Sequence, residues 1–99
     1  MTGTLHARLE ESIEECIVSR RNYYMGLWAG KLFGFSGDEL QAYAFGIVEA
    51  DYEEAGHDHV MQRLVRDFSV RGSEIARMDI ERELCRTYAV AVRQVGATD

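Results

Sequence analysis

The stretch Met25–Leu40, MGLWAGKLFGFSGDEL, holds the only tryptophan of the chain within a dense apolar run. Glycine recurs in it at positions 26, 30 and 34, although each glycine inside a helix costs about 1 kcal/mol relative to alanine. All three glycines could form a smooth ridge that a second helix approaches closely, or Gly26 and Gly30 could form it while Gly34 ends the helix. Both alternatives predict a helix-packing site. A phosphate loop is excluded, because no strand precedes the segment and the P-loop pattern is absent.

A second helix is predicted to begin directly after this stretch. Ser36 and Glu39 have the spacing of a capping box, in which each side chain bonds the other residue's backbone amide. Phe35 and Leu40 occupy the two positions of a hydrophobic staple. The helical spacing of apolar residues continues from there to about Glu54.

Further breaks at residues 55–56 and 72–73 divide the chain into four helical segments, and Gly72 is predicted to end the third. The first segment is the longest and runs from about Leu5 to Phe33. The chain has 99 residues and no proline, which suits one domain of uninterrupted helices. We therefore expect an all-α, single-domain, up-and-down four-helix bundle with a long, partly mobile N-terminal helix. Its predicted core comprises Trp28, Leu32, Phe35, Tyr43, Ile47, Leu64, Phe68, Leu84 and Tyr88.

The N-terminal third of the chain is amphipathic but weakly apolar. Leu5, Leu9 and Ile13 share one side of the expected helix, and four glutamates between residues 10 and 15 occupy the other. Glutamates four residues apart repel each other, which disfavours the helix by a few tenths of a kcal/mol. This segment is either an ordinary solvated face or a segment that stays loose until a basic partner neutralises it. We accordingly divide the chain into an amphipathic N-terminal arm (residues 1–19) and a four-helix body (residues 20–99).

Composition excludes several classes of function. Acidic residues outnumber basic ones by 17 to 11, giving a formal charge of −6, so no nucleic-acid binding is expected. The longest apolar-rich run, Tyr23 to Phe35, is shorter than the ~20 residues that span a bilayer and contains Lys31, so we expect a soluble protein without direct membrane insertion. Cys16 and Cys85 lack ligand spacing, which indicates buried thiols in a reducing cytosol.

The string DYEEAGHDH, residues 51–59, is the one cluster of potential metal ligands. His57 and His59 are two residues apart, so on one helix they would diverge by about 200° and could not bind one ion together. A helix end followed by a capped helix start explains the string better. No nucleophile–base pair or paired carboxylates stand out either. We expect no metal, no cofactor and no enzymatic activity.

Several motifs resemble the zeta-subunit family of ATPase inhibitors, which are small alphaproteobacterial proteins. The resemblance covers about Arg20 to Val95 and is nearly free of gaps. The matching motifs are RRN (20–22), GLWA (26–29), Gly34, SG (36–37), AYA (42–44), ADYEEAG (50–56) and the stretch from DHV to DF (58–68).

The resemblance implies a non-enzymatic regulatory subunit that binds the alpha and beta subunits of the F-type ATP synthase catalytic head. In that family the arm, flexible when free and helical when bound, enters an alpha/beta interface and blocks rotation in the hydrolysing direction. The implied location is cytoplasmic, peripheral to the membrane-bound synthase. Arg20 and Arg21 would be surface residues of the helix or contacts to an acidic partner. The predicted partner-binding residues are Leu5, Arg8, Leu9, Ser12, Ile13, Ile17, Arg20 and Arg21.

An alternative function belongs to a different functional class. A divergent helical protein of this kind could bind another protein without inhibiting the ATPase. It could also bind a nucleotide weakly, through the rings of Tyr23 and Tyr24 and nearby arginines.

Overall fold

The computed structural model describes the backbone of residues 2–53 and 58–97, and the side chains of residues 13–51 and 59–96. These ranges contain four helices and no strand: α1 (Thr2–Leu32), α2 (Gly37–Glu53), α3 (Asp58–Val70) and α4 (Arg77–Ala97). The all-α, four-helix prediction is confirmed. The predicted end of the second helix, near Glu54, lies outside the described residues.

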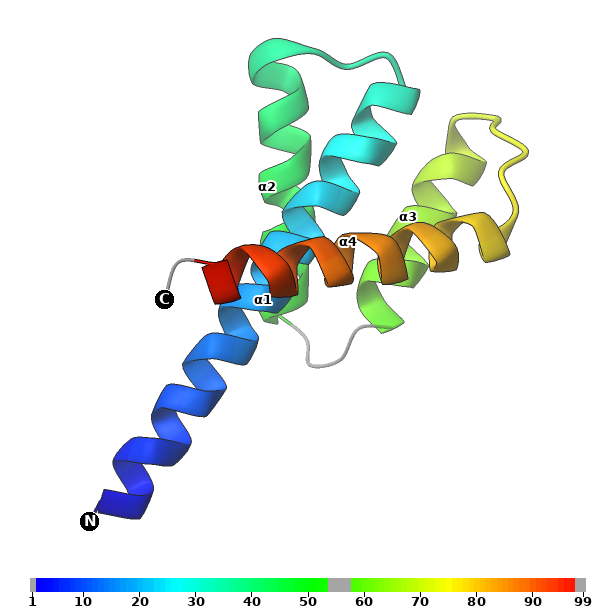
Figure 1. The fold of residues 1–99 in the computed structure, drawn as a ribbon. Coiled ribbons are helices and arrows are strands. Elements are labelled where there is room, and N and C mark those ends of the chain that lie inside the picture. Colours follow the sequence, from blue (N-terminus) through cyan, green and yellow to red (C-terminus); the bar gives the residue numbers. More distant parts are fainter. Residues whose placement is uncertain (1, 54–57, 98–99) are drawn as a thin grey trace.

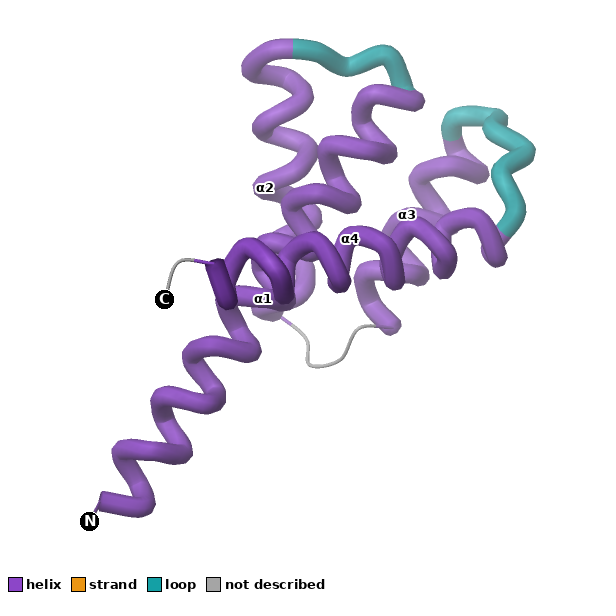
Figure 2. The backbone as a smooth tube through the Cα atoms, viewed as in Figure 1, coloured by secondary structure: helices purple, strands orange, loops and turns teal. Residues whose placement is uncertain are grey.

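The four helices form two hairpins that cross. Figure 1 shows α1 and α2 side by side as one antiparallel pair. Helix α4 crosses α1, and α3 packs next to α4. Figure 2 shows that the described connections are short loops. The N-terminal part of α1 projects from the other helices, which makes the molecule elongated, 52 × 24 × 23 Å along its principal axes. The up-and-down order is therefore present, but α4 does not run alongside α1.

Two of the three glycines in the Met25–Leu40 stretch make the contact between α1 and α2. A Cβ atom added to Gly26 would lie 2.5 Å from the Cα atom of Ala44, closer than real Cβ atoms come to any neighbour. A Cβ atom on Gly30 would lie 2.6 Å from Cδ1 of Leu40. No atom lies within 4 Å of the corresponding position at Gly34. Helix α2 thus approaches α1 at Gly26 and Gly30, and Gly34 is outside the ridge.

Gly34 ends α1 instead. Its φ of 92° lies in the left-handed region that glycine adopts readily. The N–H of Phe35 donates to the carbonyl of Gly30 at 2.9 Å, and the N–H of Gly34 donates to the carbonyl of Lys31 at 3.0 Å. This pair of bonds is a Schellman motif, and the same pattern ends α3 at Gly72, with φ 73°. The second sequence-based explanation of the glycines is therefore correct, and the predicted helix end at Gly72 is confirmed.

The predicted capping box at the start of α2 is wrong. The Ser36 hydroxyl makes no hydrogen bond to any group that the structure describes, and the Ser36 carbonyl accepts the first helical bond, from Leu40 N–H at 3.3 Å. Gly37 takes a left-handed φ of 57°, so the backbone itself makes the turn into the helix. Phe35 and Leu40, the two residues of the predicted hydrophobic staple, both lie near Gly30, and the staple contact between them stays a prediction.

The core lies where α1, α2, α3 and α4 meet. Ile47, Leu64 and Phe68 are buried as predicted. Trp28 is partly buried, with its ring 5.6 Å from that of Phe68, and Phe35, Tyr43 and Leu84 are also partly buried. The buried core cluster comprises Met25, Ala29, Ile47, Val60, Met61, Leu64, Phe68 and Ile80.

Four residues that the sequence analysis placed in the interior lie on the surface. Leu32, the last residue of α1, is 59% exposed, and Tyr88 is 36% exposed. Because α4 crosses α1, only a narrow strip of α4 is covered there, and the small residues Thr87 and Ala91 occupy it in place of Tyr88. The thiols of Cys16 and Cys85 are both exposed and free, so they do not fill the core.

Candidate functional site

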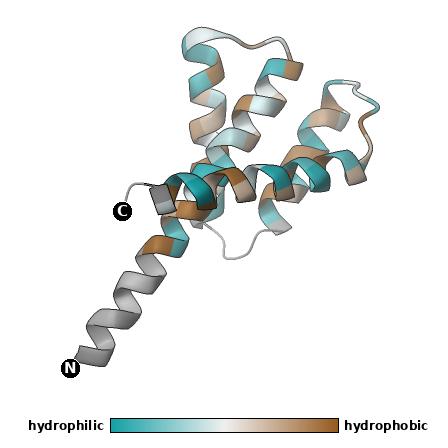
Figure 3. Ribbon diagram, viewed as in Figure 1, coloured by the Kyte–Doolittle hydropathy of each residue, from teal (hydrophilic) through white to brown (hydrophobic). Residues whose placement is uncertain are grey.

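The N-terminal part of α1 extends without a neighbouring helix (Figure 1). Figure 3 shows hydrophobic and hydrophilic bands alternating along α1 from Ile13 onward. Ile13 is 52% exposed, and the three residues that follow it are exposed as well. The side chains of the other predicted contact residues in this segment lie outside those that the structure describes: Leu5, Arg8, Leu9 and Ser12.

Among the described side chains of α1, which begin at Ile13, the first buried one is that of Ile17, which is 8% exposed. One turn later Arg20 is exposed and donates from Nη1 to Oε1 of Gln94 on α4, at 3.2 Å. Arg21 is buried, with 6% of its surface exposed. Of the predicted contact residues with described side chains, Ile13 and Arg20 therefore face solvent, whereas Ile17 and Arg21 face the body of the protein.

Arg21 is the centre of a buried polar cluster at the base of the arm. Its Nε and Nη2 atoms both donate to Oδ1 of Asn22, at 3.0 and 2.8 Å. Burial lowers the pKa of the Arg21 guanidinium, and the charge of Asp51 on α2 partly opposes that change. Nδ2 of Asn22 and Oδ1 of Asp51 are buried without a hydrogen-bond partner among the described groups. The burial of Arg21 contradicts the surface alternative for this residue, and its contact to an acidic partner stays a prediction.

Tyr88 of α4 contacts Glu14, one of the exposed residues of α1. The hydroxyl of Tyr88 donates to Oε1 of Glu14 at 3.5 Å, the limit of a hydrogen bond, and both side chains are exposed. This contact contributes little, because water competes for both groups. Among the described side chains of α1, from Ile13 onward, burial against the body therefore begins at Ile17.

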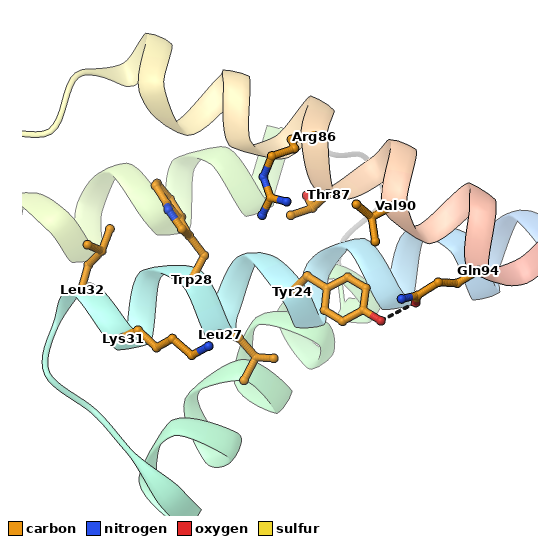
Figure 4. Close-up of a pocket in the computed structure, with 9 residues that line it drawn as sticks. All are labelled: Tyr24, Leu27, Trp28, Lys31, Leu32, Arg86, Thr87, Val90 and Gln94. Atoms are coloured by element: carbon orange, nitrogen blue, oxygen red, sulfur yellow. Dashed lines mark hydrogen bonds between the residues drawn. The ribbon is translucent and has the colours of Figure 1, made fainter.

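A pocket of about 400 Å³ lies between α1 and α4. Figure 4 shows Trp28 and Tyr24 rising from α1, and Arg86 reaching from α4 into the space above them. The Tyr24 hydroxyl donates to Gln94, and Arg86 is held by Glu83, to which its Nε donates at 2.8 Å. The remaining lining residues are Leu27, Lys31, Leu32, Thr87 and Val90.

The pocket gathers residues that the sequence analysis did not connect. Lys31 and Arg86 supply two cations beside two aromatic rings, a combination suited to an anion with an aromatic part. Their proximity depends on the crossing of α1 and α4, which no periodicity encodes. Of the two tyrosines that were predicted for nucleotide binding, only Tyr24 lines the pocket; Tyr23 packs on Phe45 of α2, with ring centroids 5.2 Å apart.

The described residues contain no group of three or more His, Cys, Asp or Glu side chains that could hold a metal ion. His57 lies outside the described residues, and His59 is partly buried. In the part of the chain that the structure covers, no helix is both long and apolar enough to cross a membrane.

These features define a class: a small all-α protein that carries one long helix beyond its own core. Comparison with known proteins gives the family. The family described as ATPase inhibitor subunit zeta matches residues 7–94, and the chain belongs to this family. The match begins within α1 and ends within α4, and it includes the whole of α2 and α3.

A solved structure has the same fold. A protein determined by solution NMR is 34% identical to this chain, with a TM-score of 0.74. The similarity covers 88% of this chain and 99% of that one. A search of curated proteins returned no match. The membership indicated by the RRN, GLWA and ADYEEAG motifs is therefore confirmed.

Proposed function

We propose that this protein is a non-enzymatic regulatory subunit that binds the catalytic head of an F-type ATP synthase and inhibits ATP hydrolysis through its N-terminal helix. The family name supports a regulatory role at an ATPase. The observation that carries the proposal is the projection of α1 beyond the body, with Ile13 52% exposed. The partner would be the interface of the alpha and beta subunits, on the cytoplasmic side of the membrane-bound enzyme.

The proposed interface uses the apolar side of the arm. An amphipathic helix binds by placing such a side into a groove, and each fully buried Leu or Ile contributes roughly 1.5–3 kcal/mol. The glutamates on the opposite side would face basic residues of the partner or solvent. The contacting residues would be Leu5, Arg8, Leu9, Ser12 and Ile13, with exposed Arg20 at the edge of the interface.

Ile17 and Arg21 have a different place in this proposal. Both are buried against the body in the free protein, so a partner reaches them only if the body opens. We assign them to anchoring: they fix where the arm begins and in which direction it points. The proposed arm accordingly ends at Cys16, three residues before the boundary that the sequence predicts.

The test is an ATP hydrolysis assay with the cognate synthase head. Added protein should slow hydrolysis, and Ile13→Ser should weaken the inhibition about tenfold or more, because a buried isoleucine contact is lost. Met78→Ser is the matched control, since Met78 is 67% exposed on α4 and outside the arm. Equal inhibition by the wild type and the Ile13 variant, or weaker inhibition by the Met78 variant alone, would contradict the assignment.

The pocket between α1 and α4 supports a second candidate function, the binding of a nucleotide. Trp28 and Tyr24 offer rings for a base, and Lys31 and Arg86 offer charge for phosphates. Titration of the free protein with ATP, followed by NMR, should shift the indole N–H of Trp28 and leave Tyr23 unaffected. Shifts centred on Tyr23 and Phe45, or none, would exclude this pocket as the site.

A further inference from the structure

Arg71 lies on two aromatic rings at the end of α3. Its Cζ atom is 4.7 Å from the ring centroid of Phe33 and 4.7 Å from that of Phe35. The two rings are 6.0 Å apart and inclined at 70°, so they form a corner that receives the guanidinium. Stacking of this kind occupies the faces of a guanidinium and leaves the N–H groups at its edge available.

The neighbouring arginines are paired, whereas Arg71 has no ion-pair partner among the residues whose side chains are described. Arg63 and Arg66 both lie beside Asp67, at 2.9 and 3.9 Å. Arg77, Arg82 and Arg86 on α4 each form an ion pair within their own helix. Within residues 13–51 and 59–96, no carboxylate or carbonyl accepts a hydrogen bond from the Arg71 side chain.

Arg71 also forms part of the wall of a pocket of about 540 Å³ that has both polar and apolar surface. Phe33 and Phe68 contribute rings to it, and their centroids are 4.7 Å apart. Leu32 and Val70 line the same pocket although they are 59% and 79% exposed. The surface lies where α1 and α3 end, remote from the N-terminus in Figure 1. We call Leu32, Phe33, Val70, Arg71 and the adjoining Ser73 the Arg71 surface.

We propose that the Arg71 surface docks a protein segment in which a carboxylate side chain stands between apolar side chains. Charge complementarity carries this choice of partner. A guanidinium fixed by stacking matches a carboxylate with two parallel hydrogen bonds, and the free edge of Arg71 provides those donors. Apolar neighbours of the carboxylate would cover Leu32 and Val70, which the body leaves in water. The surface does not include the arm, so it adds a contact beyond the proposed inhibition.

The experiment uses the full-length protein labelled with ¹⁵N and the synthetic peptide acetyl-Leu-Glu-Leu-Leu-amide. Saturable shifts are expected for the side-chain Nε–H of Arg71 and for the amides of Gly72 and Ser73. The same peptide with Gln in place of Glu should bind about tenfold more weakly, because the charge-assisted pair is lost.

Two variants separate recognition from folding. Arg71→Lys keeps the charge but loses the fork of donors, and it should weaken binding of the Glu peptide about fivefold or more. Val70→Ser removes an apolar contact at a highly exposed position and should weaken binding of both peptides. Arg93→Lys, an exposed change on α4, is the control and should leave binding unchanged.

Three results would overturn the proposal. Equal affinity for the Glu and Gln peptides would show that no carboxylate is recognised. Absence of saturable shifts would show that the surface accepts no such segment. Shifts of the same signals on concentrating the protein alone would assign the surface to a second copy of the chain.

Discussion

The two halves of α1 differ although one continuous helix contains both. From Ile17 onward, α2 and α4 cover the helix, and Met25 and Ala29 are completely buried. Before Ile17, the described side chains from Ile13 to Cys16 are exposed, and Tyr88 of α4 donates a long hydrogen bond to Glu14 among them. The same backbone geometry thus has tertiary support from Ile17 onward, whereas the described residues just before it, 13–16, have little.

The difference indicates which interactions a partner would have to supply to stabilise the N-terminal half of the helix. Most helical stability in proteins comes from packing an apolar face, and an isolated helix of about 15 residues is marginal in water. The glutamates of the arm weaken it further by mutual repulsion. A partner that covers Ile13 and neutralises the glutamates would supply what α2 and α4 supply to the rest of α1.

The largest expected effect comes from removing the arm. Deletion of residues 1–16 should abolish inhibition of ATP hydrolysis, while the thermal midpoint of the body changes by only a few degrees. Deletion of residues 1–17 should lower the stability of the body by a further ~2 kcal/mol, because buried Ile17 is lost. Thermal denaturation monitored by circular dichroism distinguishes the two truncations. Full inhibition by the protein that lacks residues 1–16 would contradict the assignment of the arm.

The second effect concerns the covered half. Gly26→Ala should destabilise the protein by about 2 kcal/mol, because overpacking against the backbone of Ala44 exceeds the gain in helix propensity. Gly30→Ala is the matched control. Its new methyl group would meet the end of the flexible Leu40 side chain at 2.6 Å and Cδ2 of the Tyr43 ring at 3.3 Å. Both neighbours are side chains rather than backbone, so the stability of this variant should stay within about 1 kcal/mol of wild type. Urea denaturation measures both, and equal losses would mean that the close approach at Gly26 is absent.

The third effect lies at the boundary between the halves. Arg21→Ala should cost about 1–2 kcal/mol, because a buried side chain is truncated and Asn22 Oδ1 loses its donors. Arg20→Ala changes an exposed neighbour and should cost about 0.5 kcal/mol or less. Chemical denaturation of the two variants gives the comparison. Indistinguishable stabilities would place Arg21 in solvent.

The smallest effect concerns the link between α2 and α3. Tyr43 donates to Oδ2 of Asp67 at 2.6 Å, and Arg63 donates to the same oxygen at 2.9 Å. Tyr43→Phe should therefore cost about 1 kcal/mol near neutral pH. Comparison of denaturation midpoints at pH 7 measures this loss.

The pH dependence of the same variant gives a second measurement. Burial, and then the bond to Asp67, raise the pKa of the Tyr43 hydroxyl, so folding favours its protonated form. The corresponding stability is complete below the unfolded-state pKa of about 10 and is lost as the pH rises above it. Wild-type stability should thus fall more steeply above pH ~10 than that of Tyr43→Phe. If the stability of the wild type and of Tyr43→Phe fell in parallel with rising pH, the burial and hydrogen bonding of the Tyr43 hydroxyl would be contradicted.

Local chemistry made the helices predictable. Gly34 and Gly72 were predictable helix ends, because such an end depends on the left-handed backbone angles of the glycine itself. The period of apolar residues correctly placed Ile47 and Phe68 in the core. The family followed from motifs rather than from periodicity. The start of α2 was predicted at the right place, but the predicted capping box is wrong. The left-handed turn at Gly37 competes with a side-chain cap.

The crossing of α4 over α1 was not predictable by the same means. It buries Thr87 rather than Tyr88 and brings Tyr24 to Gln94, two residues 70 positions apart in the chain. Amphipathic periodicity shows that a face is apolar but not which part of it a crossing helix covers. The burial of Arg21 and the composition of the pocket both follow from that crossing.

The central claim is that α1 is supported by the body only from Ile17 onward. Amide hydrogen exchange of the free protein, followed residue by residue by NMR, tests it most directly. We predict rapid exchange for residues 5–15 and strong protection for residues 22–30, with the change close to Ile17. Protection of residues 5–15 equal to that of residues 22–30 would contradict the account, since the arm would then be stable without any partner.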